Sequence, residues 1–152
     1  MKSDLPKVMH PLAGRPMVRY VVETARALQP ACLVVVVGHG ADLVRQALGD
    51  GVTYALQAER LGTGHAVRQA AEVAAGRADT TLVLFGDSPL VRPETLRRAV
   101  ARHQAESAAV TMLSFRPGDP TGYGRIVRDE AGERVIAIVE ERDATAKERA
   151  IG

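Results

Sequence analysis

The chain has 152 residues, of which 46% are hydrophobic and 25% charged, enough to bury the core of one compact domain. Its formal net charge of +2 and its 3% aromatic content exclude the basic stacking surface of a nucleic-acid-binding protein. No apolar run approaches the roughly 18 to 20 residues of a membrane span. We therefore expect one domain over residues 1–152 of a soluble cytoplasmic protein that contacts neither nucleic acid nor membrane.

Helices and strands alternate along the first half of the chain. Apolar residues at helical spacing predict a helix over residues 17–28, and the β-branched run 33–37 predicts a strand covered on both faces. A helix capped by Asp42 follows to residue 48. The single cysteine, Cys32, precedes the apolar run, so we expect a buried structural thiol and no disulfide or thiolate metal site.

The alternation continues and then changes character. Residues 66–74 have helical periodicity, residues 81–85 repeat the pattern of a buried strand, and Pro93 suits the first turn of a helix that reaches residue 103. Such an order with short loops predicts an α/β fold of three layers around a mostly parallel sheet. After residues 109–115, the short alternating segments 124–127 and 135–140 predict a small antiparallel hairpin, and Thr145 with Glu148 matches a capping box.

Ligands of open parallel sheets bind at the carboxyl ends of the strands, where Asp87 follows the apolar run 81–85. A carboxylate at this place suits Mg²⁺ held together with substrate phosphates. A solvated carboxylate or a helix cap would have the same spacing. Lys7 offers a flexible ammonium that suits phosphate neutralisation, although an exposed lysine is usually only solvated.

A second candidate region surrounds the glycine-bracketed start of the helix near residue 63. Its free backbone N–H groups favour anions or base carbonyls, and the side chain of Gln57 can pair with an amide-like base edge. A tight turn with Thr63 as N-cap is the alternative. His65 has no second histidine or cysteine at ligand spacing, so we interpret it as structural.

Gly124 and Glu140 place glycine backbone and a carboxylate at the ends of the predicted hairpin, where they could pair with sugar hydroxyls. A hairpin with charged ends would look the same. No Ser-His-Asp or Cys-His arrangement stands out, so covalent catalysis is not expected.

Six segments together resemble, in order and spacing, the uridylyltransferase domain of bacterial bifunctional N-acetylglucosamine-1-phosphate uridylyltransferase / glucosamine-1-phosphate N-acetyltransferases. They are residues 2–7, 12–17, 57–66, 86–90, 120–126 and 138–140. The resemblance implies a Rossmann-like nucleotidyltransferase that transfers uridylyl from UTP to N-acetylglucosamine 1-phosphate. The products are UDP-N-acetylglucosamine, a cell-wall precursor, and pyrophosphate.

The resemblance also implies a role for each candidate residue. Magnesium is the implied cofactor, and Asp87 its ligand. Lys7 would contact the phosphates. The uracil would be recognised by Gln57, Gly62 and Thr63, and the N-acetylglucosamine would be bound by Gly124 and Glu140.

Relative to this family the chain is expected to be incomplete at both ends, ahead of residue 1 and beyond residue 152. The family's glycine-rich phosphate loop and its acetyltransferase domain would lie outside it, so the 152-residue chain alone is expected to have little or no activity. The full-length protein would be a homotrimer through the C-terminal domain. Two alternatives remain: a related nucleotidyltransferase for another sugar phosphate or cofactor precursor, and a non-catalytic module that binds nucleotide sugars.

Overall fold

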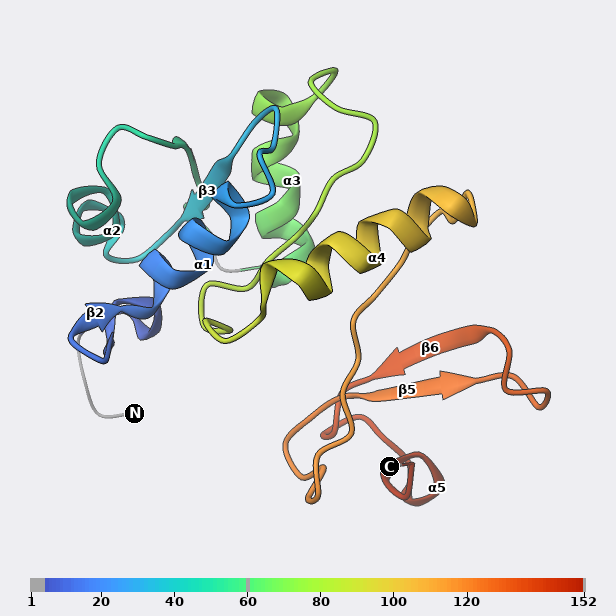
Figure 1. Cartoon of the computed structure of the whole chain (residues 1–152). Helices are drawn as coiled ribbons and strands as arrows, with labels where there is room; N and C mark the ends of the chain where they lie inside the picture. The colour runs from blue at the N-terminus through green and yellow to red at the C-terminus, as the bar shows by residue number, and fades with distance from the viewer. Residues whose placement is uncertain (1–4, 60, 152) are drawn as a thin grey trace. The chain divides into compact units, whose positions relative to one another are not determined.

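The computed structural model describes residues 5–59 and 61–151, and these divide into two compact units between Thr111 and Met112 (Figure 1). Helices and strands are mixed along the chain, as expected for the α/β class. None of the described helices is both long and apolar enough to cross a membrane. The expectation of a single domain stays a prediction.

The first unit contains most of the helices. In chain order its elements are the 3-10 turn η1 (Lys7–Met9), strands β1 (Pro11–Leu12) and β2 (Arg15–Pro16), helix α1 (Met17–Arg26), strand β3 (Val34–Val37), helix α2 (Ala41–Leu48), strand β4 (Thr53–Leu56), and helices α3 (Thr63–Ala74) and α4 (Pro93–Ala105). The four predicted helices of this part are confirmed, and Pro93 lies in the first turn of α4 as expected.

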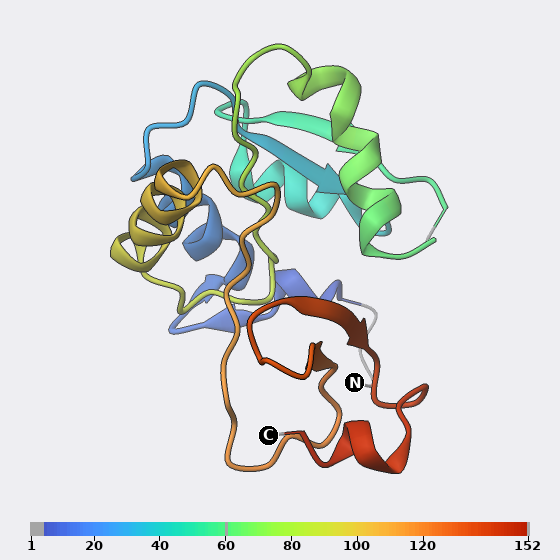
Figure 2. The same ribbon diagram turned by 90° about the vertical axis from the view of Figure 1, so that its right-hand side faces the viewer.

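The core of the first unit lies between the parallel pair β3–β4 and the helices. The pairing runs in register from Val34 opposite Thr53 to Val37 opposite Leu56, and Figure 2 shows α3 beside the two strands. Val37 packs with Val18 and Val22 of α1 and with Val44 of α2, and each of these side chains is at most 5% exposed. Burying a valine stabilises a fold by about 1.5 kcal/mol or more, so this cluster holds β3 against α1 and α2.

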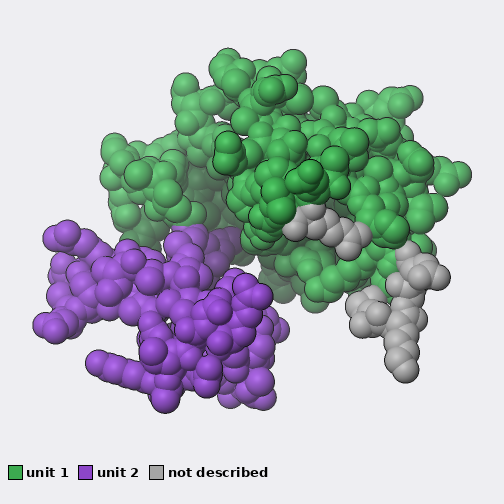
Figure 3. Space-filling model, turned by 180° about the vertical axis from the view of Figure 1, so that it is seen from behind, with its two compact units in different colours: residues 1–111 green, residues 112–152 purple. Residues whose placement is uncertain are grey.

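The second unit, purple in Figure 3, is a hairpin followed by a short helix. Strands β5 (Arg125–Arg128) and β6 (Val135–Val139) pair antiparallel, which confirms the predicted hairpin. Helix α5 (Ala146–Arg149) begins with the predicted capping box. The Thr145 hydroxyl accepts a hydrogen bond from the Glu148 backbone amide at 3.2 Å, and the Glu148 carboxylate accepts one from the Thr145 backbone amide at 2.7 Å.

The prediction of a strand over residues 81–85 is wrong. This segment makes no strand pairing within the described part of the chain, and Leu82, Val83 and Phe85 are 40%, 45% and 55% exposed. A strand forms only where a neighbour accepts and donates its ladder hydrogen bonds, which periodicity alone cannot reveal. The described strands form three separate two-stranded sheets, of which only β3–β4 is parallel.

Two smaller predictions are also wrong. Gly40, with φ +70°, is the N-cap of α2, and Asp42 lies one residue inside the helix, where its charge favours the positive helix end without capping it. Cys32 is half-buried rather than buried, and its Sγ lies 3.6 Å from Nη1 of Arg77. It precedes β3 instead of lying within the packed strand.

Candidate functional site

Two predicted phosphate-site residues, far apart in the sequence, meet in the first unit. Lys7 begins η1, and its Nζ lies 2.6 Å from Oδ2 of Asp87. Asp87 is held in a turn closed by the Ser88 amide, which donates to the Phe85 carbonyl at 3.0 Å.

Gly86 explains why this approach is possible. A Cβ at position 86 would lie 2.9 Å from Cγ1 of Val8, closer than real Cβ contacts come. The absence of a side chain therefore lets η1 pack against the turn that carries Asp87. This close approach brings the neighbouring Lys7 and Asp87 into ion-pair distance.

Both partners of this ion pair reach solvent, because the Lys7 side chain is 63% exposed and that of Asp87 34%. Exposed ion pairs contribute only about 0 to 1 kcal/mol to stability, so the pair is not what holds the unit together. Among residues 5–59 and 61–151 no three His, Cys, Asp or Glu side chains gather as metal ligands. A lone, accessible carboxylate nevertheless fits Mg²⁺, which is usually bound by one or two carboxylates together with phosphate and water oxygens.

The three predicted uracil-site residues also lie together, where β4 leads into α3. The Gln57 amide donates to the Val37 carbonyl at 2.7 Å, extending the strand pairing by one residue. Its side-chain Nε2 lies 3.1 Å from the Gly62 carbonyl and 3.1 Å from Nδ1 of His65. Gly62 is the N-cap of α3 and Thr63 its first residue, so the alternative with Thr63 as N-cap is wrong.

The backbone at this helix start requires glycine at one position only. Gly62 has φ +92° and ψ 178°, a conformation almost restricted to glycine. Gly64 does not have a positive φ, and a Cβ there would meet no atom within 4 Å. The first N–H groups of a helix have no acceptor within it, so this turn presents backbone donors beside Gln57.

In the second unit, Gly124 and Glu140 lie opposite each other at one end of the hairpin. Gly124 directly precedes β5 and Glu140 directly follows β6. A Cβ at position 124 would lie 3.7 Å from Oε2 of Glu140 and 3.4 Å from the Val139 carbonyl oxygen. A peptide backbone and a carboxylate are therefore presented side by side.

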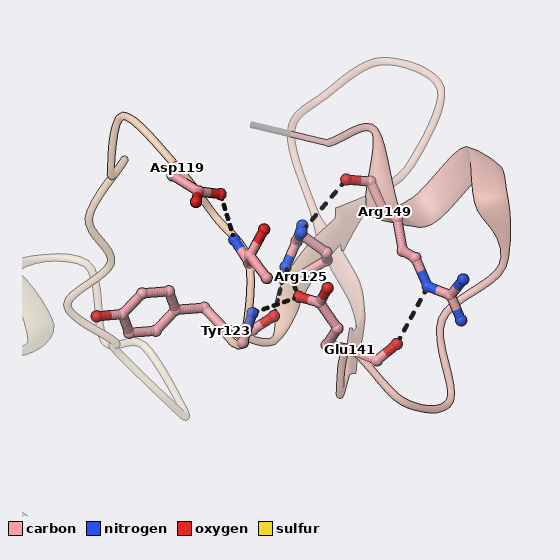
Figure 4. Close-up of polar contacts among 7 residues, drawn as sticks. Asp119, Tyr123, Arg125, Glu141 and Arg149 are labelled. Carbon is pink, nitrogen blue, oxygen red and sulfur yellow. Dashed lines mark hydrogen bonds and ion pairs between the residues drawn. The ribbon is translucent and has the colours of Figure 1, made fainter.

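A buried arginine organises the loop before β5, as Figure 4 shows. Arg125 is only 5% exposed, and its Nη1 donates to the Tyr123 carbonyl and lies 3.3 Å from Oε2 of Glu141. Its Nη2 donates to the Arg149 carbonyl at 3.3 Å, and the Gly122 amide donates to Glu141 at 2.7 Å. Within the described residues its buried Nε has no hydrogen-bond partner.

The same loop carries a perturbed carboxyl group. Hydrogen bonds from Thr121, first from its side chain and then from its backbone amide, hold the pKa of Asp119 below its ordinary value. Sequence reasoning did not single out Arg125, Glu141 or Asp119. No spacing rule marks a pair sixteen positions apart on a bulged hairpin, so only the fold could reveal them.

The first unit also has an open hollow. Cys32, Leu33, Thr53 and Arg77 are among the residues that line it, so it opens at the start of β3 and β4. The predicted site residue Gln57 follows the opposite, carboxyl end of β4. The hollow contains none of the predicted site residues.

Residues 1–149 match the MobA-like NTP transferase domain. The chain belongs to this family. Among relatives of this NTP transferase domain, the bifunctional protein GlmU of Brevibacillus brevis is 54% identical over 151 residues, covering 99% of this chain and 32% of the relative. GlmU of Cupriavidus taiwanensis is 55% identical over 152 residues, covering 99% and 33%. GlmU of Rhodospirillum rubrum is 54% identical over 153 residues, covering 100% and 34%.

These matches confirm the resemblance found in the sequence. The NTP transferase domain spans about a third of the length of the relatives it matches. Five predicted site residues lie in its first unit and two in its second. They are Lys7, Gln57, Gly62, Thr63 and Asp87, and then Gly124 and Glu140.

Proposed function

We propose that this chain forms the uridylyl-transfer site of an N-acetylglucosamine-1-phosphate uridylyltransferase. The reaction joins UTP to N-acetylglucosamine 1-phosphate and releases pyrophosphate. The observation that carries the proposal is the ion pair between Lys7 and Asp87, which unites a phosphate-neutralising group and a candidate metal ligand from segments 80 positions apart in the chain. Identity near 54% to GlmU over almost the whole chain supports it.

The proposed fold is a three-layer, Rossmann-like nucleotidyltransferase with a mostly parallel sheet. In it the pair β3–β4 supplies two neighbouring strands, and Gln57 follows the carboxyl end of β4. Binding at the carboxyl ends of parallel strands is the general rule for such sheets. The hairpin β5–β6 would be the small antiparallel region that carries the sugar-binding residues.

The proposed chemistry is an in-line displacement at the α-phosphorus of UTP. An oxygen of the sugar phosphate forms the new P–O bond, the bond between the α-phosphorus and the bridging oxygen breaks, and pyrophosphate leaves with that electron pair. A phosphate oxygen is already ionised at pH 7, so no general base is needed. Catalysis then depends on positioning and on neutralising charge.

Two residues of the chain would supply that neutralisation. The Lys7 ammonium would contact the phosphates, and Asp87 would hold Mg²⁺. When bound, the cation would offset the negative charge of the phosphate oxygens. Because both side chains are at least one third exposed, they can turn from each other toward a ligand at low cost.

The remaining site residues would supply specificity. Gln57 and the backbone of Gly62 and Thr63 would read the uracil, and Gly124 and Glu140 would hold the hydroxyl and amide groups of N-acetylglucosamine. The natural protein would act in the cytoplasm, in the synthesis of peptidoglycan and lipopolysaccharide precursors. It would assemble as a homotrimer through a C-terminal domain.

The test is a pyrophosphate-release assay with the natural protein that carries these 152 residues. We expect turnover with UTP, N-acetylglucosamine 1-phosphate and magnesium, and much less when CTP or GTP replaces UTP. Equal turnover with CTP or GTP would contradict the uracil assignment. No turnover, with calorimetric binding of UTP and magnesium retained, would instead favour a non-catalytic module.

A further inference from the structure

The side-chain amide of Gln57 is held by two acceptors. Its Nε2 lies 3.1 Å from the Gly62 carbonyl oxygen and 3.1 Å from Nδ1 of His65. A primary amide nitrogen carries two hydrogens, so both are used if Nδ1 of His65 has no proton. The Gln57 oxygen then remains as the group that this side chain can offer to a ligand.

The Gly62 carbonyl fixes the orientation of the Gln57 amide. If the amide turned over, its oxygen would lie 3.1 Å from the carbonyl oxygen of Gly62, and two acceptors would face each other. The same reversal would be needed if Nδ1 of His65 carried a proton, because a donor there requires an acceptor opposite. The surroundings of Gln57 therefore select His65 with an unprotonated Nδ1.

The other ring nitrogen then determines how Gln69 is oriented. A neutral imidazole with an unprotonated Nδ1 carries its proton on Nε2, which must donate. Nε2 of Gln69, one helical turn further along α3, lies 3.1 Å from Nε2 of His65, so the inferred tautomer requires the Gln69 amide to turn over. Its oxygen must face the ring, at the cost of the 3.4 Å contact between the Gln69 amide nitrogen and the His65 carbonyl.

We infer that His65 is a positioning residue whose hydrogen bond to Gln57 leaves the Gln57 oxygen to meet the base and thereby selects uracil over cytosine. The inference rests on the proposed function, which places the base beside Gln57. It revises our interpretation of His65 as merely structural. The relay runs from Gln69 through both nitrogens of the His65 ring to Gln57 and ends at the Gly62 carbonyl.

The selectivity follows from the donors and acceptors of the two bases. Uracil presents an N3–H donor and an O4 acceptor, which match the Gln57 oxygen and the backbone N–H groups at the start of α3. Cytosine presents a lone pair at N3 and an amino group at C4, so an acceptor would face an acceptor and a donor would face donors. A site built for one pattern rejects the other because its own polar groups are left unpaired.

A purely structural histidine would leave part of this arrangement unexplained. A pair four residues apart on one helix, such as His65 and Gln69, forms with either ring tautomer. The contact from Nδ1 to Gln57 reaches outside α3, to the residue that follows β4. It is this contact that couples the ring to the proposed base site.

The first experiment determines the ring tautomer without any substrate. Nitrogen-15 NMR of the 152-residue chain distinguishes a protonated from an unprotonated ring nitrogen by chemical shift. At a pH where the ring is neutral, we expect the proton of His65 on Nε2 and none on Nδ1. A proton on Nδ1 would overturn the inference.

The second experiment compares UTP with CTP in the natural protein. His65→Phe should lower the ratio of kcat/KM for UTP to that for CTP by about tenfold, the effect of roughly one well-placed hydrogen bond. His65→Asn should restore most of the ratio, because its side-chain oxygen can accept near the position of Nδ1. In both variants the KM for N-acetylglucosamine 1-phosphate should stay within about twofold of the wild-type value. A loss that affected both substrates would instead indicate a folding defect.

The matched control is His103→Phe. His103 lies in α4, and its ring Nδ1 is also hydrogen-bonded to a neighbouring side chain, that of Thr111. This substitution should leave the nucleotide ratio unchanged. If His65→Phe lowers turnover with UTP and CTP equally, the inference is wrong. If the wild-type protein turns over neither nucleotide, the proposed function fails, while the NMR measurement still decides whether the relay exists.

Discussion

Nζ of Lys7 lies 2.6 Å from Oδ2 of Asp87, although 80 positions separate the two residues in the chain. The sequence marks each residue as a candidate but does not show that they meet. Their meeting depends on Gly86, whose missing side chain leaves room for Val8. This relationship underlies the proposed phosphate site and leads to the first prediction.

Asp87→Asn and Lys7→Met should each lower kcat/KM for UTP by about 100-fold or more, because each removes one charge that positions or neutralises phosphate. The free energy of unfolding should change by less than about 1 kcal/mol, since the pair is solvent-exposed. Steady-state kinetics and chemical denaturation measure the two effects separately. Asp79→Asn, at an exposed carboxylate of the same unit, is the control and should retain activity. Full activity in Asp87→Asn would contradict the proposed metal-binding role.

Gly62→Ala should weaken UTP binding about tenfold, while Gly64→Ala should not. The backbone at Gly62, with φ +92° and ψ 178°, lies in a region that costs a residue with a Cβ about 1 to 3 kcal/mol. Gly64 is inside α3 with open space around its Cα, so alanine there should raise stability by up to about 1 kcal/mol. Calorimetric titration with UTP and magnesium compares the variants. Equal affinity of both variants would mean that the start of α3 does not contact the nucleotide.

Arg125→Met should destabilise the second unit by about 3 kcal/mol, because it leaves the Glu141 carboxylate and two carbonyls without their buried partner. Hydrogen exchange of residues 112–152 measures this locally, and the amide of Gly122 should lose protection. Arg134→Met is the matched control, because Arg134 is exposed and should tolerate the change. Unchanged exchange in Arg125→Met would show that the guanidinium does not order the loop.

The cap of α5 should make its stability pH-dependent. Hydrogen bonds from Thr145, first from the side chain and then from the backbone, hold the pKa of Glu148 below its ordinary value. Because the folded-state pKa is the lower one, the stabilisation is present above the unfolded-state pKa and is lost as the pH falls through the folded-state pKa. Carbon-13 NMR titration of the Glu148 carboxyl group should show this low pKa.

Thr145→Val should return the pKa of Glu148 toward its ordinary value, and Thr145→Ser should keep it low, because serine retains the hydroxyl. A pKa unaffected by Thr145→Val would indicate that another group lowers it.

Periodicity was sufficient for the helices and for β3 of the first unit, but not for the strand predicted over residues 81–85. Val18, Val22 and Val44 lie on the buried faces of α1 and α2, two of the helices that the sequence predicts. Residues 81–85 look like β3 in the sequence and still form no strand. The difference arises because a helix satisfies its hydrogen bonds locally, whereas a strand needs a partner from elsewhere in the chain.

The candidate site shows the same division. The sequence by itself determined the family of the chain and the types of group available: a lysine, an aspartate, a glutamine before a glycine-rich helix start, and a glycine with a glutamate at the ends of a hairpin. Only the tertiary structure decided that Lys7 meets Asp87 and that His65 holds Gln57. Residue types follow from local chemistry, but the distances between side chains are set by packing and hydrogen bonds that close only when distant segments fold together.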